Sequence, residues 1–168
     1  IKNTKVISFG TDTKKFYSSI KAFTKTKNKK VFRIGTNRRM ERIYDPLTLL
    51  KAAKVISKYN DNLKFILAND GSLKNEIESY INKNHLQNIV EFIGVQNGND
   101  NINFYKSIDI YVSTSLSDGG LSASIAEAMS CERLVIVADN SDNSKYITHG
   151  ENGYLFRNKD YLSLARLI

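Results

Sequence analysis

The sequence of 168 residues has one cysteine, Cys131, and two histidines. A lone cysteine cannot form a disulfide within the chain, which points to a reducing compartment. The histidines and the cysteine give no spacing typical of a zinc site, so we expect no metal and no other cofactor. No apolar run approaches the ~20 residues that span a bilayer, and we expect no signal peptide. These absences predict a cytoplasmic protein.

Glycine and proline are also scarce, with nine and one residues, whereas hydrophobic residues make up 41% of the chain. This composition predicts a globular domain with a substantial core rather than a disordered segment. The first residue is Ile1 and not methionine. We therefore expect the chain to be a piece of a longer protein.

Acidic residues are rare at the amino end of the chain. Residues 1–42 contain 13 lysines or arginines against two acidic residues, a balance of +11, whereas residues 43–168 have a balance of −3. This asymmetry indicates an anionic partner, such as phosphate or an acidic lipid, or only a lysine-rich composition that needs no partner. The aromatic residues nearby are spaced as for packing, so we expect no nucleic acid. Peripheral contact with an anionic membrane is a further expectation.

Apolar segments of strand length alternate with helical patterns along the chain. A short strand is expected at residues 5–10, and a polar stretch then runs to residue 30 like a connector. Further strands are predicted at residues 31–35, 63–68, 89–93, 108–113, 134–138 and 154–156. Helices are predicted at residues 46–60, 73–82, 102–107, 122–130 and 142–148, and from residue 160 to the last residue. Asp45 and Asp160 are the expected caps of two of these helices. The alternation predicts an α/β fold, with a parallel sheet covered by helices on both faces.

The most informative stretch begins at the strand of residues 108–113, which leads through Gly119 and Gly120 into a helix. Glycines let backbone N–H groups approach a ligand closely, and the free amides at a helix start favour an anion. Glu127 lies about one and a half turns into the helix, where its carboxylate can accept hydrogen bonds from hydroxyls beside that anion. A phosphate next to sugar hydroxyls describes a nucleotide or a nucleotide sugar. The alternative is a glycine-rich turn that binds nothing.

Five segments in this order resemble the carboxy-terminal, donor-binding domain of GT-B glycosyltransferases, in particular the retaining group known as family 4. The family's GDGP turn is similar to Asn69-Asp70-Gly71-Ser72, and its L-E-A-M-A-C helix is similar to Ala126-Glu127-Ala128-Met129-Ser130-Cys131. The other three segments are residues 8–16, residues 90–94 and residues 149–155. The resemblance implies a Rossmann-like half of a GT-B fold. It also implies that residues 1–30 connect to a missing acceptor domain, and that residues 31–168 form the nucleotide-sugar-binding domain with a truncated last helix.

The resemblance also implies roles for individual residues. Arg39 falls where the family places a diphosphate-binding arginine, with Arg38 as an immediate rival, and a guanidinium there would stabilise the departing nucleoside diphosphate. Glu127 matches the glutamate that accepts from the ribose hydroxyls. The implied catalytic residue is thus Arg39, and the implied donor-binding residues are Arg38, Gly94, Val95, Asp118, Gly119, Gly120, Leu121, Ser122 and Glu127.

Some positions depart from the family pattern. The family places seven residues between two acids, whereas eight lie between Asp118 and Glu127. Either Asp118 replaces the first acid through a one-residue bulge, or Gly119 occupies its place. Tyr44 stands where the family has a phosphate-binding lysine, and Glu132 replaces a glycine expected after the helix.

The expected function is therefore that of the donor-binding half of a retaining glycosyltransferase. The donor would be a UDP-, GDP- or ADP-sugar, and the acceptor a glycan or a lipid-linked molecule bound through the missing domain. The isolated 168 residues are expected to bind nucleotide without transferring sugar. Alternatives are a non-catalytic nucleotide-sugar or nucleic-acid binding module, or a nucleotide-sugar epimerase of the same architecture.

Overall fold

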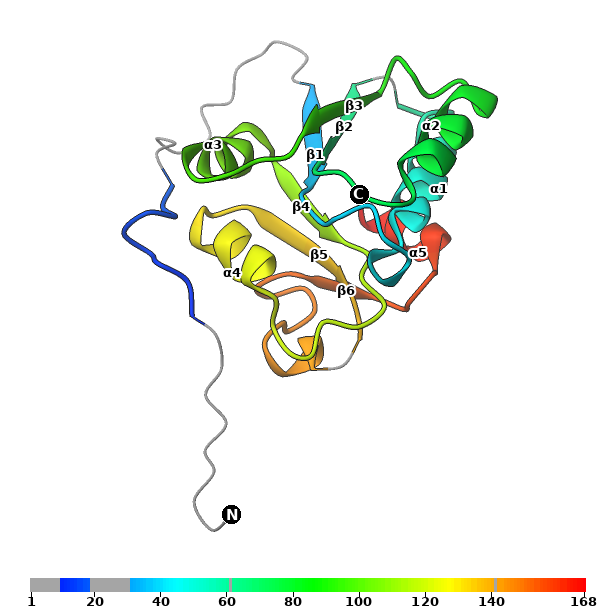
Figure 1. Cartoon of the computed structure of the whole chain (residues 1–168). Coiled ribbons are helices and arrows are strands. Elements are labelled where there is room, and N and C mark those ends of the chain that lie inside the picture. Colours follow the sequence, from blue (N-terminus) through cyan, green and yellow to red (C-terminus); the bar gives the residue numbers. More distant parts are fainter. Residues whose placement is uncertain (1–9, 19–30, 61, 141) are drawn as a thin grey trace, which may run out of the picture.

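The protein has a single six-stranded sheet in the part of the chain that the structure describes. The computed structural model describes residues 10–18, 31–60, 62–140 and 142–168, so nearly all of the strand expected at residues 5–10 lies outside the described residues. The strands run parallel in the order β3-β2-β1-β4-β5-β6 (Figure 1). Their bounds are β1 Phe32–Thr36, β2 Leu63–Ala68, β3 Val90–Gly94, β4 Ile110–Ser113, β5 Leu134–Ala138 and β6 Tyr154–Phe156.

The central strands are apolar along their whole length because both faces of the sheet are covered. All four residues of β4 are buried, as are the last four of β5. A strand exposed on one face would alternate apolar and polar residues, whereas a parallel strand between two helical layers does not. The parallel α/β sheet predicted from these runs is confirmed, and each predicted strand from residue 31 onward lies within two residues of its observed bounds.

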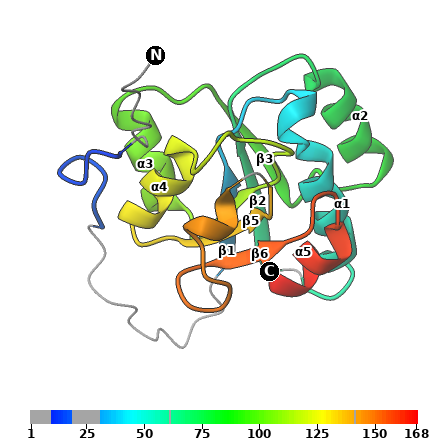
Figure 2. The same cartoon turned by 90° about the horizontal axis from the view of Figure 1, so that it is seen from below.

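Helices cover both faces of the sheet. Figures 1 and 2 show α1, α2 and α5 on one face and α3 and α4 on the other. Each layer closes its own hydrophobic core against the strands, one containing Leu49 and Ile77 and the other Tyr105 and Ile125. The helices are α1 Pro46–Ile56, α2 Lys74–Lys83, α3 Asn99–Ser107, α4 Ala123–Ser130 and α5 Tyr161–Leu167. No helix in the described part of the chain is both long enough and apolar enough to cross a membrane.

Three helices differ from the sequence prediction. Helix α1 ends at Ile56, four residues before the predicted end at residue 60. Helix α3 begins at Asn99, three residues before the predicted start, directly after Gly98, whose positive φ of 54° turns the chain into the helix. Asp100 then lies in the first turn, where a carboxylate favours the exposed N–H groups. The helix predicted at residues 142–148 is only a 3-10 turn, Asn143–Lys145. The buried Asn143 side chain donates to the carbonyl of Ala138, which ties this turn back to β5.

The expected helix caps are present, although they work in different ways. The side chain of Asp160 accepts from the backbone N–H of Ser163 and so caps α5 as predicted. Asp45 occupies the position before α1, but its carboxylate accepts from the hydroxyl of Thr48 at 2.7 Å and not from a backbone N–H. The reason is its left-handed backbone, with φ 41° rather than the extended conformation of a capping residue.

The described part of the predicted connector, residues 10–18, lies against the α3–α4 face. The Phe16 ring packs edge-on against Tyr105 with centroids 5.9 Å apart, and the Ser130 hydroxyl donates to the Phe16 carbonyl. The rest of residues 1–30 lies outside the described residues. The division of the chain near residue 30 stays a prediction.

The strand order places a topological switch point between β1 and β4. From β1 the chain continues outward to β2 and β3, and from β4 it continues to β5 and β6 on the other side. The loops that leave β1 and β4 therefore diverge, and in α/β sheets the crevice between such loops at the carboxyl ends of the strands is where ligands bind.

In β1, a Cβ added to Gly35 would lie 2.6 Å from an Ile108 methyl group, so the glycine lets the end of α3 pack closely on the strand.

Candidate nucleotide-binding site

The loops after β1 and β4 are joined to each other by hydrogen bonds. The Thr114 hydroxyl donates to the carbonyl of Tyr44 at 2.8 Å, and the backbone N–H of Leu116 donates to the carbonyl of Ile43 at 2.8 Å. The two sides of the switch-point crevice are thus held at a fixed separation.

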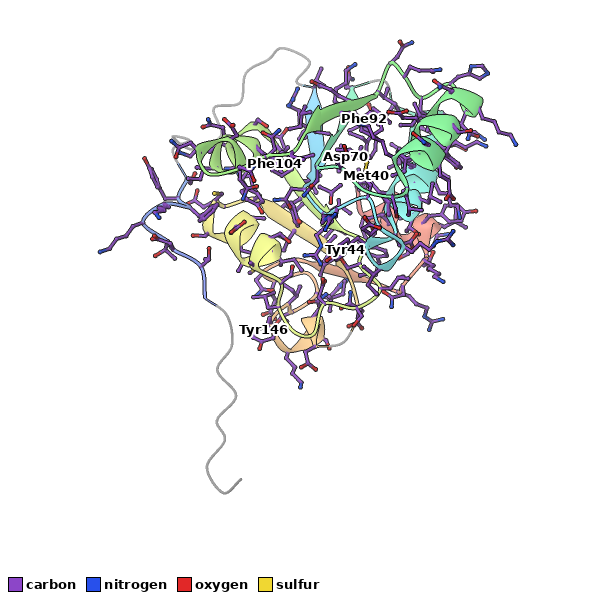
Figure 3. The ribbon with its side chains drawn as sticks, viewed as in Figure 1. Met40, Tyr44, Asp70, Phe92, Phe104 and Tyr146 are labelled. Carbon is purple, nitrogen blue, oxygen red and sulfur yellow. The ribbon has the colours of Figure 1, made fainter. Side chains whose placement is uncertain are left out.

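The turn after β2 supports the same loop from the other side. The N–H of Met40 donates to the carbonyl of Asp70, and the Met40 carbonyl accepts from the N–H of Leu73. Figure 3 shows Met40 and Asp70 close together at this point. A Cβ on Gly71 would lie 2.5 Å from the Met40 carbonyl oxygen, a backbone atom that cannot move aside. The glycine of this turn therefore fits the loop after β1 against the turn.

Arg38 points from this loop toward the start of α4. Its Nη1 donates to the Ser124 hydroxyl at 3.1 Å, and its guanidinium lies over the Tyr44 ring, 4.3 Å from the ring centre. Its Nη2 pairs with Asp118 Oδ1. The Arg38 side chain is 16% exposed and that of Asp118 is fully buried. The family resemblance favoured Arg39 and kept Arg38 as its rival, whereas the structure directs Arg38 into the crevice.

Arg39 faces solvent. Its side chain is 66% exposed and approaches Glu41 at 3.8 Å. Glu41 also accepts from the hydroxyl and the backbone N–H of Ser72 at 2.5 and 3.1 Å, and these hydrogen bonds hold the pKa of its carboxyl below the usual value. Arg39 still lines the mouth of the crevice, although it makes no contact with α4 of the kind that Arg38 makes.

The glycine turn before α4 leaves open space for a ligand. Gly119 and Gly120 have φ of 67° and 124°, which L side chains rarely adopt, and a Cβ on either would touch nothing within 4 Å. Glycine is therefore needed at these two positions for the backbone conformation of the turn, and not because a neighbouring group packs closely against it. The Ser122 hydroxyl accepts from the N–H of Ile125, which makes Ser122 the N-cap of α4, and Leu121 packs partly buried on the α4 face. Arg38 contacts Ser124 in the first turn of α4, so the free N–H groups of this turn lie near its guanidinium.

Glu127 lies on α4 and is held by two residues of α3. Its Oε2 accepts from the Tyr105 hydroxyl at 2.8 Å and from Asn101 Nδ2 at 3.2 Å. Among the described residues, no hydrogen bond reaches Oε1. The carboxylate therefore has one oxygen fixed within the protein and one oxygen able to accept from a ligand.

Asn37, the residue before Arg38, connects this arrangement to β1. Its Nδ2 donates to Asn101 Oδ1 at 2.8 Å and to the Tyr105 hydroxyl at 2.7 Å, and its Oδ1 accepts from the Tyr111 hydroxyl at 2.8 Å. Burial raises the pKa of Tyr111 to about 12 and raises that of Tyr105 further, so both hydroxyls stay protonated. Sequence reasoning missed Asn37, Asn101, Tyr105 and Tyr111. The available signal was the spacing of four residues between Asn101 and Tyr105, which puts both on one face of a helix.

Gly94 and Val95 belong to a separate part of the same sheet edge. Gly94 is the last residue of β3, two strands away from β1, and Val95 follows it with 54% of its surface exposed. The Gly94 carbonyl accepts from the N–H of Asn69 at 2.6 Å. The structure thus brings Arg38, Asp118, Ser122 and Glu127 together around the start of α4. It places Arg39 at the mouth, and Gly94 and Val95 at the end of β3.

The crevice is small. A hollow of about 130 Å³ is lined by Asn37, Arg38, Arg39, Tyr44 and Ser124. A larger hollow of about 370 Å³ lies between α1, α2 and α5, and its lining of lysines, tyrosines and one valine includes no acidic residue. We place the site in the smaller one because the switch point, the helix start and the paired charges all meet there. The Arg38 side chain that pairs with Asp118 lines this hollow.

A family model described as Glycosyl transferases group 1 matches residues 12–168, nearly the whole chain. The chain belongs to this family. Two uncharacterized glycosyltransferases of Methanocaldococcus jannaschii are 35% identical over 91 residues and 31% identical over 83 residues, which is 54% and 49% of this chain. The matched segments make up only 22% and 21% of those two relatives.

Solved protein structures share the fold. The C-terminal domain of the Francisella tularensis group 1 family protein LpcC matches with a TM-score of 0.79 and 23% identity, over 94% of this chain and 85% of that one. HepE of Anabaena, solved with UDP and glucose, matches with a TM-score of 0.81 and 21% identity, over 96% and 45% of the two chains. TarM of S. aureus, solved with UDP, has a TM-score of 0.75 and 25% identity, over 90% and 30%. This group 1 domain therefore has the Rossmann-like fold of a GT-B carboxy-terminal domain.

The single cysteine of this glycosyltransferase domain is a core residue. Cys131 is fully buried, and burial raises the pKa of its thiol, which disfavours the reactive thiolate. Within the described ranges, no cluster of three or more histidine, cysteine, aspartate or glutamate residues is arranged to hold a metal ion. The chemistry that the crevice offers is thus that of arginine, helix amides and two carboxylates.

Proposed function

We propose that this chain is the donor-binding domain of a retaining glycosyltransferase that moves a sugar from a nucleoside-diphosphate sugar to a glycan or lipid-linked acceptor. The observation that carries the proposal is the meeting of Arg38, the N-terminus of α4 and Glu127 at the switch point. A guanidinium and free amides suit a diphosphate, and a carboxylate further along the helix suits the ribose hydroxyls. TarM, which is 25% identical, was solved with UDP, and this supports a nucleotide as the ligand of this chain.

In this proposal the protein acts mainly on the leaving group. When the bond between the sugar and the diphosphate breaks, negative charge develops on the diphosphate, and arginine together with helix amides stabilises it. The acceptor hydroxyl attacks from the side of the departing phosphate, which takes up its proton, so the anomeric configuration is retained without a covalent intermediate. Asp118 pairs with Arg38, and Glu127 accepts from Tyr105 through Oε2 alone.

The two arginines are proposed to contribute unequally to diphosphate binding. Arg38 already contacts α4 through Ser124, whereas Arg39 is mostly exposed at the mouth. A diphosphate seated at the helix start would meet Arg38 first. Arg39 would reach the same phosphates from the solvent side and add a weaker, screened attraction.

Isothermal titration of the chain with UDP, GDP, ADP and pyrophosphate tests the proposal. We expect Glu127→Ala to weaken the preferred nucleoside diphosphate roughly tenfold or more and to leave pyrophosphate unchanged, because only the ribose contact is lost. Arg38→Ala should weaken both ligands roughly tenfold, and Arg39→Ala should weaken them less. Arg157→Ala, which removes an exposed arginine after β6, is the matched control. Absence of binding by all four ligands would overturn the proposal.

A further inference from the structure

Tyr105 is a buried residue with two polar contacts that connect separate parts of the crevice. Its side chain is fully buried, and its hydroxyl accepts from Asn37 Nδ2 at 2.7 Å and donates to Glu127 Oε2 at 2.8 Å. A hydroxyl has one proton, and Asn37 provides the donor on the other side. The direction of the Tyr105–Glu127 hydrogen bond is therefore fixed toward the carboxylate.

The neighbours of this hydroxyl leave it little freedom. The Tyr105 ring packs against Phe104, Tyr111 and Phe16, with centroids 5.3, 5.7 and 5.9 Å away. Asn37 is in turn fixed by the Tyr111 hydroxyl and by Asn69, whose Nδ2 donates to the Asn37 carbonyl at 3.1 Å. A side chain confined in this way presents its donor at one point. The half-buried Glu127 carboxylate can rotate on its own helix unless such a donor selects its orientation.

We infer that Tyr105, together with Asn101, is a positioning residue that orients the Glu127 carboxylate so that Oε1 faces the ribose hydroxyls of the bound nucleotide. This inference rests on the proposed function, since it assigns the means by which the donor site distinguishes a ribose. Both donors end on Oε2, which leaves Oε1 as the acceptor for the ligand. The contribution of Tyr105 to binding is therefore expected only for ligands that carry the 2′- and 3′-hydroxyls.

The same network joins the ribose side of the site to the diphosphate side. Asn37 contacts both α3 donors, and the next residue is Arg38, whose guanidinium faces the start of α4. A change in the orientation of the Asn37 side chain would thus disturb both the ribose side and the diphosphate side of the site. Loss of the Tyr105 hydroxyl alone should disturb only the ribose side. This difference makes Tyr105→Phe the more selective change.

The test compares UDP, 2′,3′-dideoxy-UDP and pyrophosphate by isothermal titration of the chain, with the corresponding GDP and ADP pairs if either base binds more tightly. We expect wild type to bind UDP roughly tenfold more tightly than the dideoxy form. Tyr105→Phe and Asn101→Ala should each weaken UDP about fivefold and leave dideoxy-UDP and pyrophosphate within twofold. Tyr80→Phe, which removes a hydroxyl on the opposite face of the sheet, should change none of these affinities.

The outcomes separate the two proposals. If wild type binds no ligand, the proposed function fails. If wild type prefers UDP over dideoxy-UDP and both variants keep that preference, the positioning role is overturned while the proposed function stands. An equal loss for all three ligands, with a lower unfolding temperature, would show that Tyr105 only supports the fold. Because Asn101 is half-buried, Asn101→Ala reports on the inference even if Tyr105→Phe unfolds.

Discussion

Arg38 and Asp118 are held together at the place where the diphosphate is proposed to bind. The pair is incompletely satisfied, because Arg38 Nε and Asp118 Oδ2 are buried without a hydrogen-bond partner among the described residues. A buried ion pair gains little when its remaining polar atoms have no partner. A phosphate, with more acceptor oxygens than a carboxylate, could replace Asp118 and use these donors more fully.

This competition predicts the effect of Asp118→Asn. The amide keeps the size of the side chain and removes the charge that opposes phosphate, so we expect pyrophosphate and UDP to bind roughly threefold to tenfold more tightly. Isothermal titration measures the change, and Asp142→Asn, at an exposed aspartate paired with Lys145, is the control. Weaker binding of pyrophosphate by Asp118→Asn would contradict the idea of a competing carboxylate. Weaker binding of a UDP-sugar alone would assign Asp118 to the sugar.

At the scale of single residues, the sequence indicates which kind of side chain a site uses better than it indicates where that side chain points. Motif position restricted the diphosphate arginine to Arg38 or Arg39, but neighbouring residues in a loop point in different directions that depend on the loop's tertiary hydrogen bonds. The fixing of Glu127 by Tyr105 was not predictable for a related reason. Tyr105 follows Phe104 in a mostly polar helix, where two adjacent aromatic rings indicate packing. Its hydroxyl becomes important only when the loop after β1 brings Asn37 beside it.

Among the elements, α4 was predicted most fully because its signals are local. The glycine turn, the Ser122 cap and the apolar face each depend on a few adjacent residues, and each is present in the structure. After the end of α4, the sequence departs from the family pattern, because Glu132 stands where the family has a glycine. The structure gives the physical reason, since Glu132 has a left-handed φ of 57° and the N–H of Arg133 donates to the carbonyl of Ala128 across the helix end.

The strained helix end predicts a stabilising substitution. Glycine adopts a left-handed backbone without the penalty that a Cβ brings, so Glu132→Gly should raise the free energy of unfolding by about 0.5–1 kcal/mol after the greater entropy of the unfolded chain is allowed for. Urea unfolding measures this difference. Glu151→Gly, at an exposed turn residue whose φ is not positive, should give no stabilisation. An equal or lower stability of Glu132→Gly would show that the left-handed position carries no strain.

For the molecule as a whole, the parallel order of strands was predictable because it follows from burial on both faces. The start of α3 and the short turn after β5 were not, since they depend on Gly98 and on the bond from Asn143 to β5. The positive charge is also a property of the whole chain. The net charge is +8, and the excess lies in residues 1–42, the part that includes Arg38 and Arg39.

This charge distribution predicts nucleotide binding without a divalent cation. Two negative phosphates need neutralisation, and the arginines of the loop after β1 together with the N-terminus of α4 provide it, while the net charge of +8 adds a long-range attraction. A guanidinium and free amides can take the place of the magnesium ion that holds phosphates through carboxylates in other sites. We expect the UDP affinity in EDTA to lie within twofold of that in millimolar magnesium, and to fall as sodium chloride is raised because the attraction is screened. A loss of more than about fivefold in EDTA, restored by magnesium, would show that a metal ion completes the site.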